Sequence, residues 1–131
     1  MTLVSITRLR LRSILFFLPF VLRAQASNRQ ATNTPGCRGV LTRKTRGLTF
    51  WTLSLWDDEK SMRAFLRGSP HREAMPKLAQ WCDEASVGHW VQECGDFPGW
   101  DAATRLMQAH GHLSRVLHPS SAHSAGVMNV T

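Results

Sequence analysis

Apolar residues dominate the stretch from Leu48 to Trp56 on both of its alternating faces, and this stretch predicts a buried strand. Both alternating sets are apolar or small; one set is Leu48, Phe50, Thr52, Ser54 and Trp56, and the other is Thr49, Trp51, Leu53 and Leu55. A strand with apolar residues on both faces is central in its sheet or covered on both sides. In a small antiparallel sheet, the simplest second cover is another subunit, and we expect one here.

Two helical segments are predicted after this strand. Asp57 or Asp58 caps the first segment, its first turn is acidic, and Gly68 ends it. The second segment begins at Ser69-Pro70. Because Pro76 lies in its early part, we expect a break near residues 72–76.

The N-terminal part of the chain predicts a strand followed by a helix. The strand covers Leu3 to Leu11, with a bulge or an early end near Arg8 to Arg10. Ser13 is suited to cap the helix, and Pro19 predicts either a kink or a helix start near residue 17. The residues that we expect to face the core are Leu15, Phe16, Leu18, Leu22 and Ala26.

Three further elements complete the pattern. Turn residues at Thr34 to Gly36 precede a second strand, Val87 to Cys94 form a fourth, and a third helix opens at Pro98. This order of elements predicts an α+β ferredoxin-like sandwich, with a four-stranded antiparallel sheet and helices on one face. We expect this domain to span residues 1–111 and the C-terminal tail, residues 112–131, to be loosely ordered.

The chain has 131 residues, the size of one domain, and a formal net charge of +7. This charge permits a nucleic acid, an anionic membrane surface or an acidic ligand as partner. The basic clusters are Arg8, Arg10, Arg12 and Arg38, Arg43, Lys44, Arg46. No zinc-finger spacing, RNP-type aromatic motif or long basic helix accompanies them, so we expect a solvated basic face and no specific nucleic-acid binding.

The N-terminus also resembles a secretory signal. Arginines precede the apolar run from Ile14 to Leu22, and the small residues Ala24 and Ala26 follow it. The run is shorter than the roughly 20 residues of a transmembrane helix, so we expect no transmembrane segment. We favour a structural segment, because the fold would otherwise lack a strand and a helix; cleavage near Ser27 is the alternative.

Three cysteines, Cys37, Cys82 and Cys94, occur at irregular spacing without a CxxC motif. Their odd number argues against a disulfide framework and a thiolate zinc site. We expect free thiols in the cytoplasm, each behaving as a small buried hydrophobe.

Two histidines are candidates for proton chemistry, because imidazole titrates near neutral pH. His71 lies at the start of the second predicted helical segment, and His89 lies on the predicted fourth strand. The structural alternatives are a hydrogen-bonded first-turn histidine for His71 and an outward-facing strand residue for His89. Of the later histidines only His110 and His112 are close together, and their spacing does not favour a metal site.

Five phrases of the sequence together resemble the DUF3291-type proteins: TPGCRGVL, LSLWDDEKSMRAF, SPHREAM, SVGHWV and PGWDAATRLMQAHG. Those proteins belong to the dimeric α+β barrel superfamily, which also contains the antibiotic-biosynthesis monooxygenases and the small haem-degrading monooxygenases. The resemblance implies a homodimer whose two four-stranded sheets pack into a barrel. It also implies a pocket in each subunit between the sheet and the helices.

The chain departs from the haem-degrading members at two positions. Where those enzymes place a haem-ligating histidine, this chain has Met75, and where they place an asparagine on the first strand, it has Thr7. These departures disfavour haem, and we expect no cofactor.

The resemblance and the tryptophans together give three functional hypotheses. The first is an oxygenase-like enzyme for a bulky apolar substrate, with His71 or His89 as the proton acceptor. The alternatives are a non-catalytic protein that binds a hydrophobic small molecule and a module that only dimerises. For ligand binding, the expected pocket residues are Trp51, Trp56, Phe65, Met75 and Trp90.

Overall fold

The computed structural model describes residues 1–131, which form one antiparallel sheet with helices packed against it. The strands are β1 (Thr2–Leu11), β2 (Cys37–Lys44), β3 (Thr49–Trp56), β4 (Cys82–Gln92) and β5 (His112–Leu113). The helices are the 3-10 helix η1 (Ile14–Phe16), α1 (Phe17–Asn33), α2 (Glu59–Arg67), α3 (His71–Trp81), α4 (Trp100–His110) and α5 (Ser121–Ser124).

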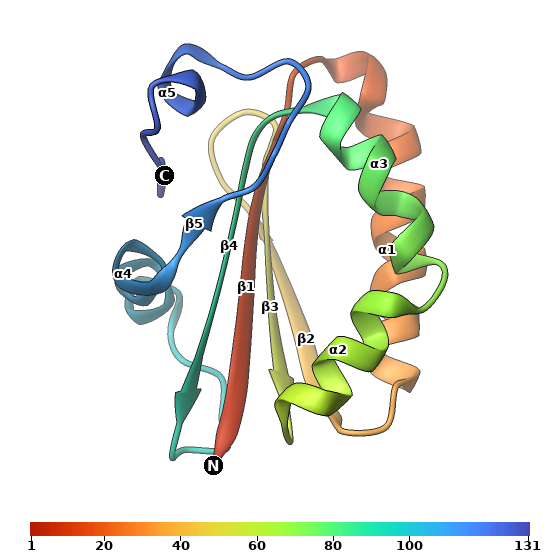
Figure 1. Ribbon diagram of the computed structural model, residues 1–131, viewed down its shortest axis with the longest axis vertical. Helices are drawn as coiled ribbons and strands as arrows, with labels where there is room; N and C mark the ends of the chain where they lie inside the picture. The colour runs from red at the N-terminus through yellow and green to blue at the C-terminus, as the bar shows by residue number, and fades with distance from the viewer.

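All neighbouring strands pair antiparallel, in the order β2-β3-β1-β4-β5. Helices α1, α2 and α3 lie on one side of this sheet, and α4 and α5 lie on the other (Figure 1). The predicted α+β ferredoxin-like class is confirmed. Two details differ, because β5 adds a short fifth strand and the helices cover both faces of the sheet.

The face of the sheet toward α4 is filled by large apolar side chains. The buried cluster consists of Val4, Ile6, Trp51, Leu53, Leu55, Trp90, Ala103 and Met107. Ala103 and Met107 belong to α4 and have no exposed surface. The expectation that another subunit covers β3 on this side is therefore wrong for its central positions, because α4 returns over the sheet within the same chain.

η1 and α1 meet the sheet through a different face from the one predicted. Phe20 and Ala31 are buried, whereas Leu15, Leu18 and Leu22 are exposed. The prediction failed because the run from residue 14 to residue 22 is apolar on every side, so its pattern does not define one face. The predicted helix start near residue 17 is confirmed. None of the helices combines the length and the hydropathy that crossing a membrane requires.

The ends of α2 follow the sequence closely, but α3 does not. The side chain of Asp58 accepts a hydrogen bond from the backbone N–H of Ser61 at 2.8 Å, as expected of an N-cap, and Gly68 ends the helix. The break predicted near residues 72–76 is absent, because α3 continues through Pro76. Pro76 and Arg72 are both exposed, so water can bond the Arg72 carbonyl that proline leaves without a partner.

β4 begins earlier than predicted, directly after α3. Its first residues include Asp83 and Glu84, which do not give a strand pattern in the sequence. Arginines on β1 bind both carboxylates: Arg10 donates to Asp83 through Nε and Nη2, each at 2.8 Å, and Arg8 Nη1 donates to Glu84 at 2.9 Å. Arg8 is only 3% exposed, so it does not belong to a solvated basic face.

The segment 112–131 makes fixed contacts with the sheet. β5 pairs with β4, and Ser120 and Asn129 donate hydrogen bonds to the carboxylate of Glu84 at 2.7 and 3.1 Å. Arg8 donates to the Thr131 carbonyl at 3.0 Å. These partners are polar and far from one another in sequence, which is why the apolar pattern did not reveal them. Loose order of this segment in solution stays a prediction.

The three cysteines are free but differ in exposure. Cys82 is buried, and burial raises the pKa of its thiol to about 12. Cys94 is exposed, because β4 ends before it, so the expectation of a buried thiol is wrong there. Cys37 is half-buried.

Candidate functional site

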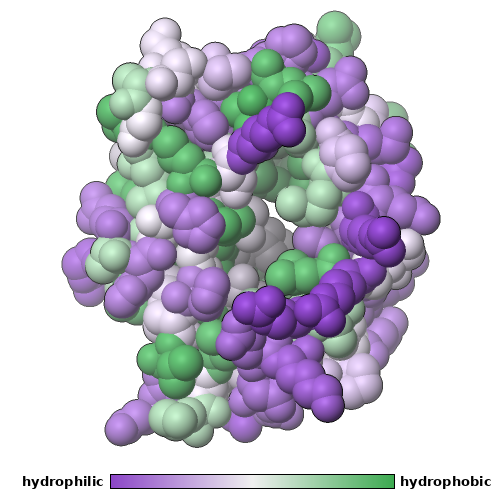
Figure 2. All heavy atoms as spheres, in the orientation of Figure 1, coloured by the Kyte–Doolittle hydropathy of each residue, from purple (hydrophilic) through white to green (hydrophobic).

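The helix-facing side of the sheet carries small hydroxyl residues at its centre. Ser5 and Thr7 of β1 lie opposite Ser54 and Thr52 of β3, and all four are half-buried although their strands are central. Small side chains leave space beneath the helices. Figure 2 shows a hollow near the middle of the molecule, between the sheet and the helices.

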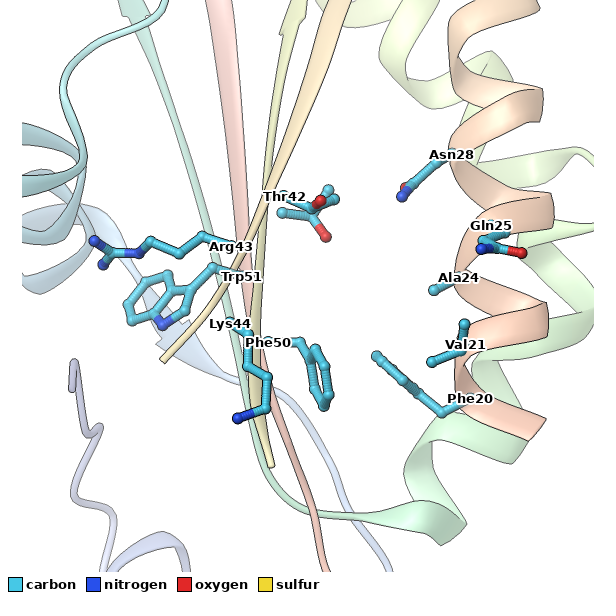
Figure 3. A pocket seen from close by; sticks show the side chains of 11 residues that line it. Phe20, Val21, Ala24, Gln25, Asn28, Thr42, Arg43, Lys44, Phe50 and Trp51 are labelled. Atoms are coloured by element: carbon cyan, nitrogen blue, oxygen red, sulfur yellow. The ribbon is translucent and has the colours of Figure 1, made fainter. Parts of the chain in front are cut away.

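A pocket lies between α1 and the strands β2 and β3. It has a cavity volume of about 240 Å³ and is lined by Phe20, Val21, Ala24, Gln25, Asn28, Thr42, Arg43, Lys44, Phe50, Trp51 and Thr52. We call it the α1–β3 pocket. In Figure 3, α1 presents Phe20, Ala24 and Asn28 toward Thr42 and Phe50. Residues 20, 24 and 28 follow one another at intervals of four, the spacing of one helix face.

The α1–β3 pocket has an apolar end and a polar end. The rings of Phe20 and Phe50 pack with their centroids 4.8 Å apart. Toward the polar end, the side chains of Gln25, Asn28 and Thr42 make no hydrogen bond to another protein group. Such groups can exchange water for a polar atom of a ligand without breaking a contact within the protein.

The only ionisable side chains in the lining are Arg43 and Lys44. Figure 3 shows Arg43 and Trp51 on the far side of the strands from α1. There the Arg43 guanidinium lies over the ring of Trp100 at 4.6 Å and over that of Trp51 at 5.8 Å. The pocket thus contains no carboxylate and no imidazole, and its chemistry is that of hydrogen bonding and apolar contact.

A second cavity of about 460 Å³ lies between the start of β1, the end of β4 and the N-terminus of α2. Its lining consists of Met1, Thr2, Leu3, Asp57, Asp58, Glu59, His89, Trp90 and Val91. His89 is exposed here. The acidic side chains beside it have other partners: Asp58 caps α2, and Glu59 accepts hydrogen bonds from Arg63, which lower the pKa of Glu59. His89 therefore lies in an open acidic cleft and lacks a dedicated proton partner.

His71 lies in an aromatic stack away from both cavities. Its ring centroid is 4.6 Å from that of Phe65, which in turn is 5.4 Å from that of Trp56. Burial lowers the pKa of His71, opposed by a hydrogen bond with the backbone of Leu66, and its Nδ1 is buried without a partner. Gln30 fixes the helix start, since its Oε1 accepts the His71 backbone N–H at 2.7 Å.

The position that the resemblance associates with haem ligation does not face a cavity. Met75 is 46% exposed on α3 and lines neither cavity. No group of three or more His, Cys, Asp or Glu side chains converges as a metal site either.

The family model of DUF3291, a domain of unknown function, matches residues 18–116, well over half of the chain. The chain belongs to the DUF3291 family. The α1–β3 pocket, His71 and His89 all lie within the matched residues of this DUF3291 domain. A search of curated proteins finds no match.

Solved structures with the same fold include antibiotic-biosynthesis oxygenases. SnoaB of Streptomyces nogalater, a cofactor-independent oxygenase solved in a mutant form, superposes with a TM-score of 0.60 at 12% identity, over 71% of this chain and 94% of SnoaB. A Nitrosomonas europaea protein proposed to be an antibiotic-biosynthesis monooxygenase gives 0.63 at 13% identity, over 70% and 90%. A conserved Methanosarcina mazei protein gives 0.64 at 15% identity, over 70% and 93%.

The predicted site residues of this DUF3291 chain do not converge on one place. Trp51 is among the residues around the α1–β3 pocket, but its ring lies in the core on the far side of the strands; His89 and Trp90 line the second cavity, and Met75 lies at the surface. The remaining three, Trp56, Phe65 and His71, form the aromatic stack.

Sequence reasoning missed the α1 side of the pocket. Asn28 and Gln25 lie in or next to the polar run from Ser27 to Thr34, which gives no apolar period and so does not predict a helix face. The signal that identifies Asn28 is the spacing of four between Phe20, Ala24 and Asn28.

Proposed function

We propose that this DUF3291 protein binds a small aromatic molecule in the α1–β3 pocket. The observation that carries the proposal is the pairing, in one pocket, of the Phe20 and Phe50 rings with the amide of Asn28 and the hydroxyl of Thr42, which have no partner in the protein. Ligand sites combine apolar walls with a few polar groups in this way. A cavity of about 240 Å³ limits the ligand to one or two rings.

Oxygenase chemistry is the second candidate, and the likeness to SnoaB favours it. A cofactor-independent reaction needs a proton acceptor beside the substrate. The α1–β3 pocket has Lys44 at its rim and no histidine. The geometry therefore supports binding more strongly than catalysis, and the acid–base roles proposed for His71 and His89 lose support because neither lines this pocket.

We also propose, on the resemblance alone, that the protein is a homodimer. A barrel of two facing sheets would need the α4 side of the sheet to be free, whereas Val4, Ile6 and Leu53 are fully buried there by α4 and the C-terminal segment. If two chains with this fold form a dimer, they must touch through a surface other than the α4 side of the sheet, or α4 must move away from that side. Sedimentation velocity at micromolar concentration tests this, and a monomer rejects the assembly.

Equilibrium dialysis with 1-naphthol, a two-ring phenol, tests the binding proposal. Ala24→Leu fills the pocket from α1, and we expect affinity to fall by at least about tenfold. Gln108→Leu, at an exposed position on α4, is the matched control and should bind as the wild type does. Equal affinity in all three proteins, or none in the wild type, contradicts the proposal.

Oxygen consumption separates binding from catalysis. An oxygen electrode measures oxygen uptake with a dihydroxynaphthalene as the probe, in buffer containing a metal chelator. Uptake that depends on the wild-type protein and is lost in Ala24→Leu supports oxygenase activity. Binding without uptake of oxygen supports the non-catalytic alternative.

A further inference from the structure

The start of the first helical segment exposes an apolar surface that nothing in the chain covers. Ile14, Leu15, Leu18 and Leu22 are 66, 81, 65 and 59% exposed, and Phe17 is 38% exposed at the edge of this surface, where its ring packs against that of Phe50 with centroids 6.1 Å apart. Ile14, Leu18 and Leu22 follow one another at intervals of four, so they project on one side of the segment. We call these five residues the N-terminal apolar patch.

The patch is held outward by the packing on the opposite side of the same segment. Phe16 stacks on Trp81 with ring centroids 6.2 Å apart, and Phe20 packs against Phe50. The hydroxyl of Ser13 accepts a hydrogen bond from the backbone N–H of Leu15 at 3.2 Å and fixes the first turn. Since the inner side is occupied, the exposed leucines cannot turn into the core without displacing these rings.

The charge of the surrounding chain is one-sided. Residues 1–56 hold nine of the sixteen Lys and Arg residues of the protein and none of its nine Asp and Glu residues. Arg12, Arg23 and Arg29 lie in or beside the helical segment that carries the patch. At the start of β4, the carboxylate of Asp83 is already held by Arg10. An occupant of the patch must therefore be apolar where it meets the leucines and anionic around them.

We propose that the N-terminal apolar patch docks on the surface of an anionic lipid bilayer. Leu15 and Leu18 enter the boundary between headgroups and acyl chains, and the flanking arginines contact the anionic headgroups. The combination of exposed leucines, an aromatic residue and arginines that form no salt bridge is typical of helices that lie in the membrane interface. The proposal is independent of the α1–β3 pocket, whose lining residues lie on the inner side of α1.

A second copy of the chain fits the patch less well. Two patches facing each other would bring together two arginine-bearing segments that have no carboxylate of their own to pair with. Like charges brought together at an interface oppose association. An anionic bilayer satisfies the same arginines and also covers the leucines.

Vesicle co-sedimentation with the full chain tests the proposal. We expect the wild type to pellet with vesicles of pure phosphatidylglycerol and to remain in the supernatant with vesicles of pure phosphatidylcholine. Leu15→Gln/Leu18→Gln should weaken partitioning by at least about tenfold, because two exposed leucines no longer insert. Arg23→Gln/Arg29→Gln should weaken it as well and reduce its dependence on salt.

Leu66→Gln/Val91→Gln is the matched control, since both residues are exposed apolar side chains on other elements, α2 and β4. This variant should pellet as the wild type does. Thermal melting of each variant verifies that it is folded, which is expected because every substituted leucine is solvent-exposed.

Three outcomes overturn the proposal. In the first, the wild type does not pellet with phosphatidylglycerol vesicles. In the second, the Leu15→Gln/Leu18→Gln variant pellets as well as the wild type does, which would show attraction by charge alone. Alternatively, sedimentation velocity without lipid shows that the same double variant converts a dimer into a monomer, which would assign the patch to a second copy.

Discussion

The two faces of the sheet differ in how they are covered, although they share the same strands. Toward α4, β3 presents Trp51, Leu53 and Leu55, all with 2% exposure or less. Toward α1, the intervening residues Thr52 and Ser54 are half-buried, and Thr52 lines the α1–β3 pocket. One face is therefore a packed core and the other holds the candidate binding pocket.

The difference shows how one strand can serve stability and binding together. Side chains of a strand alternate between the two faces, so neighbouring positions can be selected for different roles. Leu53 fills space between the sheet and α4, whereas Thr52 leaves space open and supplies a hydroxyl. Substitutions at two adjacent positions should therefore differ in effect, one mainly lowering stability and the other mainly weakening ligand binding.

The largest loss of stability is expected for Glu84→Ala, on the α4 side. Glu84 and Arg8 form an ion pair with side-chain exposures of 6 and 4%, and removing the carboxylate leaves the arginine charge buried without its partner. Such a change costs about 3–5 kcal/mol. Urea denaturation measures it against Glu93→Ala, an exposed control; similar midpoints for the two variants would contradict the buried pair.

A comparison of Leu53→Ala with Thr52→Ala tests the contrast between the faces directly. Leu53→Ala opens a cavity in a filled core and should lower the free energy of unfolding by about 2–5 kcal/mol. Thr52→Ala should lower it by less than about 1 kcal/mol, the range of strand propensities. Urea denaturation provides both values, and equal losses would mean that the α1 side is packed as tightly as the α4 side.

The helix-facing side should also show a pH dependence that arises from His71. Burial lowers the pKa of His71 below its ordinary value of 6.5, so the unfolded chain binds this proton more readily than the folded protein. Stability therefore falls as the pH falls from about 6.5 through the lowered pKa, and His71 has no such effect above that range.

Melting temperatures measured between neutral and acidic pH test this expectation. His71→Phe keeps a ring against Phe65 but cannot take up the proton, so its melting temperature should fall less steeply with acid than that of the wild type. Parallel curves for the two proteins would rule out the buried histidine as a source of the pH dependence.

The smallest effect is expected for haemin. Met75 stands where the haem-degrading enzymes have their ligating histidine, and it is exposed and lines neither cavity, so we expect no shift of the Soret band when haemin is added. A shift that is present in the wild type and lost in His71→Ala would contradict this part of the account.

The sequence predicts the fold well because its strongest signals are local. The two-sided apolar strand, the cap at Asp58 and the end at Gly68 each depend on neighbouring residues, and the structure confirms them. The resemblance to DUF3291 proteins is confirmed as family membership.

The site could not be predicted equally well, because it depends on packing between distant segments. The aromatic and histidine residues that were predicted to be functional lie in three places: the aromatic stack, the second cavity and the core on the α4 side. The α1–β3 pocket is formed by a face of α1 that the apolar run of residues 14–22 does not define. Arg8 and Glu84 are 76 positions apart, and only the pairing of β1 with β4 brings them together.

An amide NMR titration with 1-naphthol tests the binding site most directly. We expect the largest shifts at Ala24, Asn28 and Thr52, and we expect them to disappear in Ala24→Leu, while Leu53 and Met107 respond little. The absence of shifts, or shifts centred on α4 or on the second cavity around His89, would contradict the assignment of the α1–β3 pocket as the ligand site.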